Sequence, residues 1–301
     1  MDGMRRVMPI LALVVLAGCG PSHSGPAPGE GDGNAPSIGL TALPSPGRPV
    51  PTDPHLLARD LARVNGLLEG SVRAWVVEGA SSPPPTAVAL LALYQQRIYG
   101  TLAAHRGLNR AVVGLLPADL VRTVEANVFA DRQLSSLSGP SSAKPPHIRT
   151  HPPPSAATLL GFYKEAQRRF DVAWPVLAAV NLVESRFDRV VSASSAGAQG
   201  PMQFIPATWA AYGLGGDLHD PRDAILGAAN YLSASGAPAD YRRALYAYNP
   251  SSAYVAAVLA YARQMMKDPL VFYEYYNWQV FVATPTGDRQ ITGPGTGRTG
   301  E

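Results

Sequence analysis

The sequence has only one cysteine, Cys19, among its 301 residues. A disulfide bond within the chain is therefore excluded, and the lone thiol needs another explanation. Charged residues are also scarce, at 16% of the chain, and the formal net charge is only +3. No stripe of Lys and Arg alternates with aromatic residues. Nucleic acid is therefore not expected as a partner. The six histidines are scattered along the chain, so we expect neither a metal site nor a cofactor.

The N-terminus lacks an apolar run long enough to span a bilayer. Its run over residues 7–17 has eleven residues and follows two arginines, which is typical of a signal peptide. The run ends in Leu-Ala-Gly-Cys, which resembles a lipobox. We therefore predict a lipoprotein signal peptide over residues 1–18, with Cys19 as the lipidation site and membrane anchor. The alternative is an ordinary signal peptide with an incidental cysteine.

Proline and glycine cluster at particular places in the chain. Residues 19–52 are rich in both and have few large apolar side chains, which predicts a disordered tether. Residues 139–154 contain six prolines and are interpreted as a linker. His147 and His151 lie four residues apart, as two metal ligands on a helix would. The surrounding prolines exclude that helix, so both are interpreted as solvated linker residues.

Between these segments, apolar residues recur at helical spacing. They predict a small helical module over residues 53–138 and a second helical domain over residues 155–284. The module has no catalytic constellation. It could bind a partner or only pack against the second domain, and packing is the favoured interpretation. The fold class is therefore mainly α.

The C-terminal end has a different pattern. Residues 278–284 alternate between apolar and polar, residues 285–288 read Pro-Thr-Gly-Asp, and an extended stretch follows. This pattern predicts a short β-hairpin. We assign residues 285–301 to the end of the hairpin and a flexible tail.

Glu184 lies on the apolar stripe of a predicted helix, in line with Leu177 and Val180. A carboxylate on a buried face is costly unless it is paired or used. Burial disfavours the ionised form and raises the pKa, which suits a group that must protonate a glycosidic oxygen. The alternative is a structural ion pair with Arg186 or Arg189 at the end of the same helix.

Two later segments add groups suited to sugars. Gly197 and Gly200 allow tight turns, and Gln203 offers an amide to hydroxyl or N-acetyl groups. No strand precedes these glycines and a third glycine is missing, so a dinucleotide fingerprint is excluded. Residues 246–250, Tyr-Ala-Tyr-Asn-Pro, combine aromatic and amide groups, a makeup common in carbohydrate sites.

Together these segments resemble the lytic transglycosylases of the lysozyme superfamily. Glu184-Ser185 looks like their Glu-Ser motif. Residues 197–206 look like their Gly-x-x-Gly-x-Met-Gln-x-x-Pro motif, with Pro201 where Leu is frequent. Residues 247–249 look like their Ala-Tyr-Asn motif. The order and spacing are as in the family, and three ordered motifs are specific where each alone is weak.

The resemblance covers about residues 155–268 and implies a lysozyme-like helical catalytic domain. It further implies a peptidoglycan lytic transglycosylase that needs no cofactor. Glu184 would protonate the oxygen between N-acetylmuramic acid and N-acetylglucosamine. It would then accept the proton of the muramoyl C6 hydroxyl as that oxygen closes onto C1, which gives a 1,6-anhydro end. The enzyme would be exported and lipid-anchored, at the outer face of the cytoplasmic membrane or in the periplasm, and a cell-wall protein could bind residues 53–137.

The family positions also imply substrate-binding roles for four residues. Ser194 would hydrogen-bond near the catalytic acid, and Gln203 would contact the substrate. Tyr248 would position Glu184, and Asn249 would line the cleft. For Asn249 the alternative is a cap of the helix before Pro250.

Two other functions stay open. A hydrolytic muramidase would need a second carboxylate about 5 to 9.5 Å from the first, and Asp188 and Asp217 are the candidates. Asp188 is interpreted as a surface or capping residue and Asp217 as a turn residue. Since neither is compelling, a single acid is favoured. A lipoprotein that only binds glycan or scaffolds other wall proteins is the non-catalytic alternative, and the intact Glu184-Ser185 argues against it.

Overall fold

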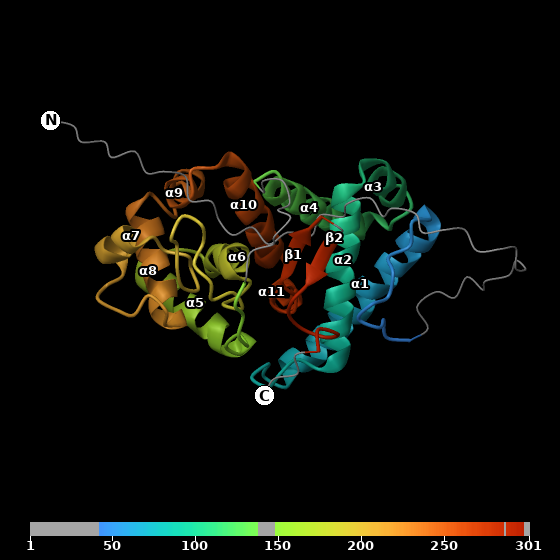
Figure 1. Cartoon of the computed structure of the whole chain (residues 1–301), viewed down its shortest axis with the longest axis horizontal. Helices are drawn as coiled ribbons and strands as arrows, with labels where there is room; N and C mark the ends of the chain where they lie inside the picture. The colour runs from blue at the N-terminus through green and yellow to red at the C-terminus, as the bar shows by residue number, and fades with distance from the viewer. Residues whose placement is uncertain (1–41, 138–147, 286, 298–301) are drawn as a thin grey trace, which may run out of the picture. The chain divides into compact units, whose positions relative to one another are not determined.

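The computed structural model describes residues 42–137, 148–285 and 287–297. In this part of the chain it contains eleven helices and one two-stranded hairpin (Figure 1). The predicted mainly α class is confirmed, and the architecture is consistent with a lysozyme-like fold. The predicted signal peptide, with Cys19, lies outside the described residues.

Two compact units divide the chain. Of the described residues, unit 1 contains 148–268 and unit 2 contains 42–137 together with the C-terminal segment from 269. None of the helices in the described part is long and apolar enough to cross a membrane.

Unit 1 contains the helices of the expected catalytic domain. They are α5 (Ala156–Phe170), α6 (Trp174–Ser185), α7 (Pro206–Tyr212), α8 (Pro221–Ala234), α9 (Tyr241–Tyr248) and α10 (Ser252–Lys267). Several begin with a side chain that accepts a backbone N–H, as Ser155, Asp220, Asp240 and Ser251 do. Such caps satisfy N–H groups that have no partner within the helix, so they fix where the helix begins.

The central helix of unit 1 is α6, which packs against α5, α8 and α10. Every residue of α6 after Trp174 is buried. A helix that is apolar nearly all round belongs in a core, because no face has to meet water. Glu184 and Ser185 stand at its C-terminal end and are therefore buried with the rest of the helix.

Unit 2 is built on two long helices. Its elements are α1 (Pro54–Val77), α2 (Thr86–Ala104), α3 (Arg106–Val113), α4 (Ala118–Ser135), α11 (Leu270–Tyr276), β1 (Phe281–Thr284) and β2 (Gly287–Gln290). α1 packs on α2, and α11 contacts both. The strands pair antiparallel, from Phe281 opposite Gln290 to Thr284 opposite Gly287. This confirms the predicted C-terminal hairpin.

The boundary between the two units lies at residues 268 and 269, before the predicted end of the catalytic domain at residue 284. Residues from 269 onward belong to unit 2, because buried amide groups of α2 bind them. Gln96 Nε2 donates to the carbonyl of Gln279 at 2.9 Å, and Gln96 Oε1 accepts the N–H of Gln279 at 2.7 Å. Trp278 Nε1 donates to Gln95 Oε1 at 3.1 Å. Polar groups so deeply buried need partners, and these partners lie more than 180 residues away in sequence.

The expected tether also ends earlier than composition indicates. Residues 42–52 have defined structure, and Arg97 and Arg48 explain why. Arg97 Nη1 donates to the carbonyls of Pro46 and Arg48, at 3.0 and 2.8 Å. Arg48 Nη2 pairs with the buried carboxylate of Asp60 at 3.1 Å. These contacts hold in place a proline-rich segment that has no apolar periodicity of its own.

Candidate active site

Glu184 is a buried carboxyl group with one engaged oxygen. Its side chain is 3% exposed, and Oε1 accepts a hydrogen bond from the hydroxyl of Tyr254 at 2.7 Å. Oε2 is buried without a hydrogen-bond partner in the described part of the chain. Burial raises the pKa of Glu184 to about 8, and the Tyr254 hydrogen bond opposes that rise only in part. Glu184 therefore carries a proton at neutral pH and can donate it.

The chain leaves α6 through a left-handed turn. Arg186, Phe187 and Asp188 have φ angles of 57°, 59° and 67°. For residues other than glycine this region costs roughly 1–2 kcal/mol each. Full burial of Phe187 and its N–H bond to the carbonyl of Asn181 at 3.2 Å hold the turn in place. The turn begins two residues after Glu184.

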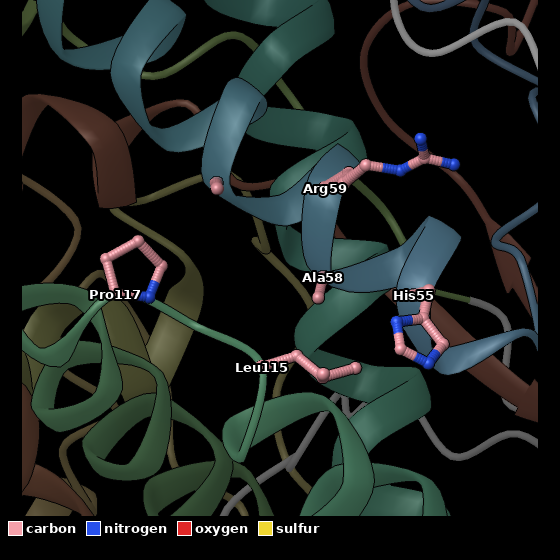
Figure 2. A pocket seen from close by; sticks show the side chains of 6 residues that line it. His55, Ala58, Arg59, Leu115 and Pro117 are labelled. Atoms are coloured by element: carbon pink, nitrogen blue, oxygen red, sulfur yellow. The ribbon is translucent and has the colours of Figure 1, made fainter.

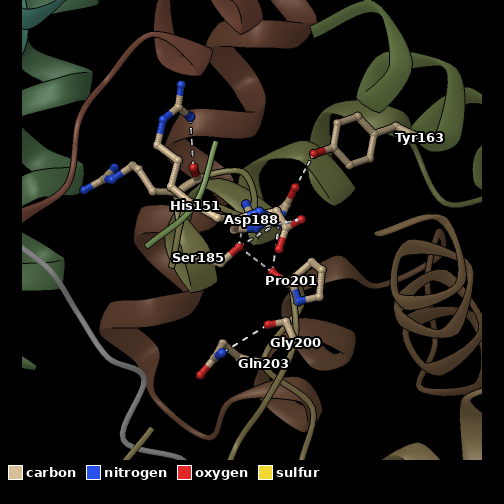
Figure 3. A network of polar contacts seen from close by, with 10 residues as sticks. His151, Tyr163, Ser185, Asp188, Gly200, Pro201 and Gln203 are labelled. Carbon is tan, nitrogen blue, oxygen red and sulfur yellow. Dashed lines mark hydrogen bonds and ion pairs between the residues drawn. The ribbon is translucent and has the colours of Figure 1, made fainter. Parts of the chain in front are cut away.

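Ser185 links this turn to the glycine-rich loop. Its hydroxyl donates to the carbonyl of Pro201 at 2.6 Å and accepts the N–H of Asp188 at 2.8 Å. Asn181 donates to the same Pro201 carbonyl at 2.8 Å and accepts from Tyr163 (Figure 3). The two residues of the Glu-Ser pair therefore differ in what they contribute. Glu184 supplies the buried carboxyl group, and Ser185 connects the end of α6 to the glycine-rich loop by hydrogen bonds.

The glycine-rich loop is a tight hairpin. Gln199 and Phe204 exchange both backbone hydrogen bonds at 2.9 Å. Gly200 has φ +74°, and a Cβ at this position would meet the carbonyl oxygen of Leu218 at 2.2 Å. No other residue fits here without moving the backbone. The sequence therefore needs glycine at 200 for space as well as for conformation.

Gln203 lies on this hairpin with φ 49° and is 2% exposed. Its Nε2 donates to the carbonyl of Gly200 at 3.0 Å, while Oε1 is buried without a partner in the described residues. A buried amide oxygen without a partner is costly unless a ligand or a water supplies the donor. That is the property expected of a residue that contacts substrate.

Tyr248 has a different partner from the one predicted. Its hydroxyl donates to the carbonyl of Met202 at 2.6 Å and so holds the glycine-rich hairpin. The hydroxyl bonded to Glu184 belongs to Tyr254, on α10. Tyr254 lies on α10, after the Ala-Tyr-Asn motif of residues 247–249, so none of the three motifs contains it. Its position on the buried face of α10 is the only sequence signal that could have indicated it.

The other two predicted binding residues are buried within the same unit. Ser194 is 6% exposed, and its Oγ accepts the N–H of Ala198 at 3.0 Å, which closes the loop before the hairpin. Asn249 is 3% exposed and ends α9, where its N–H donates to the carbonyl of Leu245 at 2.9 Å. The capping alternative for Asn249 thus agrees with its backbone position.

An aromatic row extends from the hairpin. Phe204 contacts the ring of Tyr248 at a centroid distance of 5.8 Å, Tyr248 contacts Tyr231 at 5.6 Å, and Tyr231 contacts Tyr212 at 4.6 Å. Tyr248 is buried, whereas Tyr231 and Tyr212 are partly exposed. Partly exposed aromatic faces can stack on sugar rings.

Asp188 is buried, contrary to its interpretation as a surface residue. It is 4% exposed, and its Oδ2 lies 3.4 Å from Nε2 of His151. His151 thus contacts a buried carboxylate while its side chain stays exposed, as the linker interpretation predicts; His147 lies outside the described residues. Asp217, by contrast, is exposed and accepts the N–H of His219 at 2.8 Å, as the turn interpretation predicts.

The acid and its neighbours offer no metal site. Among the described residues, no group of three or more His, Cys, Asp or Glu side chains could hold a metal ion.

A cavity of about 410 Å³ lies in unit 2 (Figure 2). Its lining residues come from α1 and from the connection between α3 and α4: His55, Ala58, Arg59, Ala62, Leu115 and Pro117. It contains no carboxyl group and lies in the other unit from Glu184, so we do not assign it to the catalytic site. The predicted cell-wall protein partner of residues 53–137 stays a prediction.

Part of the chain matches a known protein family. Residues 162–270 match the family described as "Transglycosylase SLT domain". The match contains Glu184, the glycine-rich hairpin, Tyr248 and Tyr254. No curated protein and no solved structure gives a significant match to the chain.

Proposed function

We propose that the chain is a peptidoglycan lytic transglycosylase, because residues 162–270 match the transglycosylase SLT domain family. It cleaves the β-1,4 bond between N-acetylmuramic acid and N-acetylglucosamine and leaves a 1,6-anhydro end. Glu184 serves as the single general acid and base. Gln203, Ser194 and Asn249 belong to the substrate site.

The observation that carries the proposal is the state of Glu184. The pKa of Glu184 is raised to about 8 by burial, so the group keeps its proton near neutral pH. Its Oε1 is fixed by Tyr254, and Oε2 has no hydrogen-bond partner among the described residues. One oriented and otherwise unengaged oxygen is what a proton transfer to the glycosidic oxygen requires.

Two proton transfers complete the reaction. Glu184 gives its proton to the glycosidic oxygen as the bond from C1 to that oxygen breaks. The C6 hydroxyl oxygen of the same muramoyl residue then bonds to C1, and its proton returns to Glu184. The hydrogen bond from Tyr254 stabilises the carboxylate between the two steps. Water is not consumed, and Glu184 ends in its starting state.

The hydrolytic alternative needs a second carboxylate that is free to act. Asp188 is paired with His151, and Asp217 accepts a backbone N–H within its own turn. Both carboxylates have structural partners, which supports a mechanism with one acid.

Product analysis tests the proposal. Cell wall is digested with the full chain and with Glu184→Gln, and the fragments are weighed by mass spectrometry. We expect anhydro ends from the wild type and a loss of about 100- to 10,000-fold in rate from the variant. Reducing ends would support the muramidase instead. Wall cleavage by Glu184→Gln at the wild-type rate would refute the role of Glu184, and no cleavage by the wild type would favour the non-catalytic lipoprotein.

We also propose that the protein is exported and anchored through a lipid on Cys19. The support is the sequence Leu-Ala-Gly-Cys behind a short apolar run. Labelling cells with radioactive palmitate tests this proposal: the wild type should take up label and sediment with membranes. Cys19→Ala should do neither, and equal labelling of the two proteins would contradict it.

A further inference from the structure

A short segment before α5 pairs with the chain just after α6. The N–H of His151 donates to the carbonyl of Arg189 at 3.1 Å, and the N–H of Val191 donates to the carbonyl of Arg149 at 3.0 Å. These bonds form a minimal antiparallel ladder. We call residues 149–151 the strap. It lies outside the region that matches the SLT family.

The strap brings His151 to a buried carboxylate. Asp188 Oδ2 lies 3.4 Å from Nε2 of His151, and the two side chains face each other beside Ser185 in Figure 3. Asp188 is 4% exposed, while the side chain of His151 is 43% exposed. A buried carboxylate without a partner would be expelled or protonated. His151 is the group on the strap that prevents this.

Asp188 is directly connected to the catalytic acid's helix. Its N–H donates to Ser185 Oγ at 2.8 Å, and Ser185 follows Glu184 in the chain. Ser185 also donates to the carbonyl of Pro201, which precedes the part of the hairpin that contains Gln203. A shift of Asp188 would therefore displace both Glu184 and the hairpin that contains Gln203.

From this chain of contacts we propose that His151 and Asp188 form a positioning pair for Glu184. The inference rests on the proposed function. Neither side chain touches substrate in this role. The side chain of His151 holds Asp188 in the left-handed turn, and the N–H of Asp188 holds the hydroxyl of Ser185. Ser185 in turn fixes the end of α6 against the glycine-rich hairpin. The strap thereby makes the segment before the SLT match part of the catalytic apparatus.

Protonation of Asp188 determines how the pair depends on pH. Burial raises the pKa of Asp188 to about 6, and His151 opposes the rise. The other charged groups that act on Asp188 are Asp220, which raises its pKa, and His219, which lowers it. Without His151 the pKa of Asp188 must rise further. The carboxyl is then neutral in acid and becomes an uncompensated buried charge as the pH increases.

The first test uses His151→Ala in the full chain, assayed on soluble glycan strands. We expect kcat to fall about 10- to 100-fold at pH 7.5, because small misplacements of a catalytic group have effects of this size. KM should stay within about twofold, and the defect should shrink at pH 5. Arg149→Ala is the matched control, because its exposed side chain leaves the strap's backbone bonds intact. A wild-type kcat in His151→Ala would overturn the proposal.

The second test is a rescue. Asparagine at 188 keeps the shape of aspartate without its charge, so burying it does not require a partner for a negative charge. We expect the double variant His151→Ala, Asp188→Asn to recover most of the kcat lost at pH 7.5. A double variant as slow as His151→Ala would show that the histidine acts in some other way.

A third readout needs no activity at all. Amide hydrogen exchange reports the N–H of Asp188 on Ser185 and the N–H of Val190 on the carbonyl of Ser185 at 3.0 Å. Both should lose protection in His151→Ala at pH 7.5 and keep it in Arg149→Ala. If the wild type failed to cleave cell wall, the proposed function would fall while this measurement still tested the pair. Unchanged protection would overturn the pair.

Discussion

At the scale of single residues, the two oxygens of Glu184 have different surroundings. One is bonded to Tyr254, and the other is buried without a hydrogen-bond partner among the described residues. Burial without compensation costs stability, and active sites are places where such a cost persists because function requires it. Glu184 is therefore a residue whose replacement should stabilise the protein while it removes activity.

We expect the free energy of unfolding of Glu184→Gln to exceed that of the wild type by an amount that grows as the pH rises. Between about pH 4.5, the ordinary value, and pH 8, the unfolded carboxyl has lost its proton while the folded one keeps it. The wild type therefore loses stability with rising pH over this window, and glutamine does not. The difference at pH 8 should be on the order of 4 kcal/mol. Thermal melting at pH 5 and pH 8 measures it; an equal difference at both would contradict burial as the cause.

Tyr254→Phe should move the alkaline limb of the pH–rate profile to higher pH. The Tyr254 hydrogen bond lowers the pKa of Glu184, so its removal raises that pKa and keeps the acid protonated further into alkali. Turnover should still fall about tenfold, because the carboxylate formed in the reaction loses a charged hydrogen bond.

Tyr248→Phe is the comparison for Tyr254→Phe. Its hydroxyl is bonded to the Met202 carbonyl and not to Glu184. This variant should lower the rate without shifting the alkaline limb. A shift of equal size in both variants would argue against Tyr254 as the specific partner of the acid.

At the scale of elements, the glycine-rich hairpin and the left-handed turn after α6 form one unit. Ser185 and Tyr248 anchor two consecutive carbonyls of the hairpin, those of Pro201 and Met202. The hairpin's shape in turn depends on glycine. Its conformation is thus determined by contacts at both ends and in the middle.

Gly200→Ala and Gly197→Ala separate backbone strain from lack of space. Both glycines have positive φ, +74° and +80°. A Cβ at 197 meets nothing within 4 Å, whereas one at 200 meets the Leu218 carbonyl. We expect Gly197→Ala to lower stability by about 1 kcal/mol and Gly200→Ala by about 3 kcal/mol or more. Urea unfolding of the two variants measures the difference, and equal losses would contradict the steric explanation.

At the scale of the whole molecule, the chain leaves unit 2, builds unit 1 and returns to unit 2. Trp278 is a main anchor of the return. It is 3% exposed, its ring centroid lies 4.6 Å from that of Tyr275, and Gln95 accepts its Nε1–H. The helical module and the C-terminal hairpin therefore share one core.

Trp278→Ala should weaken unit 2 and spare unit 1. A large-to-small change at a buried tryptophan costs about 3–5 kcal/mol. Hydrogen exchange should show lost protection in α1, α2 and α11 and unchanged protection in α6 and α10. Val77→Ala, at a side chain 84% exposed, is the control and should change little. Loss of protection in α6 instead of α1 would contradict the division into these units.

The sequence by itself determined the features that depend on neighbours along the chain. Helical periodicity, proline breaks and the Pro-Thr-Gly-Asp turn predicted a mainly α chain with a C-terminal hairpin, and both predictions are confirmed. The apolar stripe through Glu184 indicated burial of that carboxyl for the same reason: residues three and four apart share a helix face.

Only the tertiary structure decided which distant groups meet. Tyr254 lies 70 residues from the carboxyl it binds, Gln96 lies 183 residues from Gln279, and the exposed His151 lies against the buried carboxylate of Asp188. Such pairs leave no periodic pattern, because their geometry depends on how whole helices pack. The acid could be found from its own helix, while the groups that orient it could be found only from the packed fold.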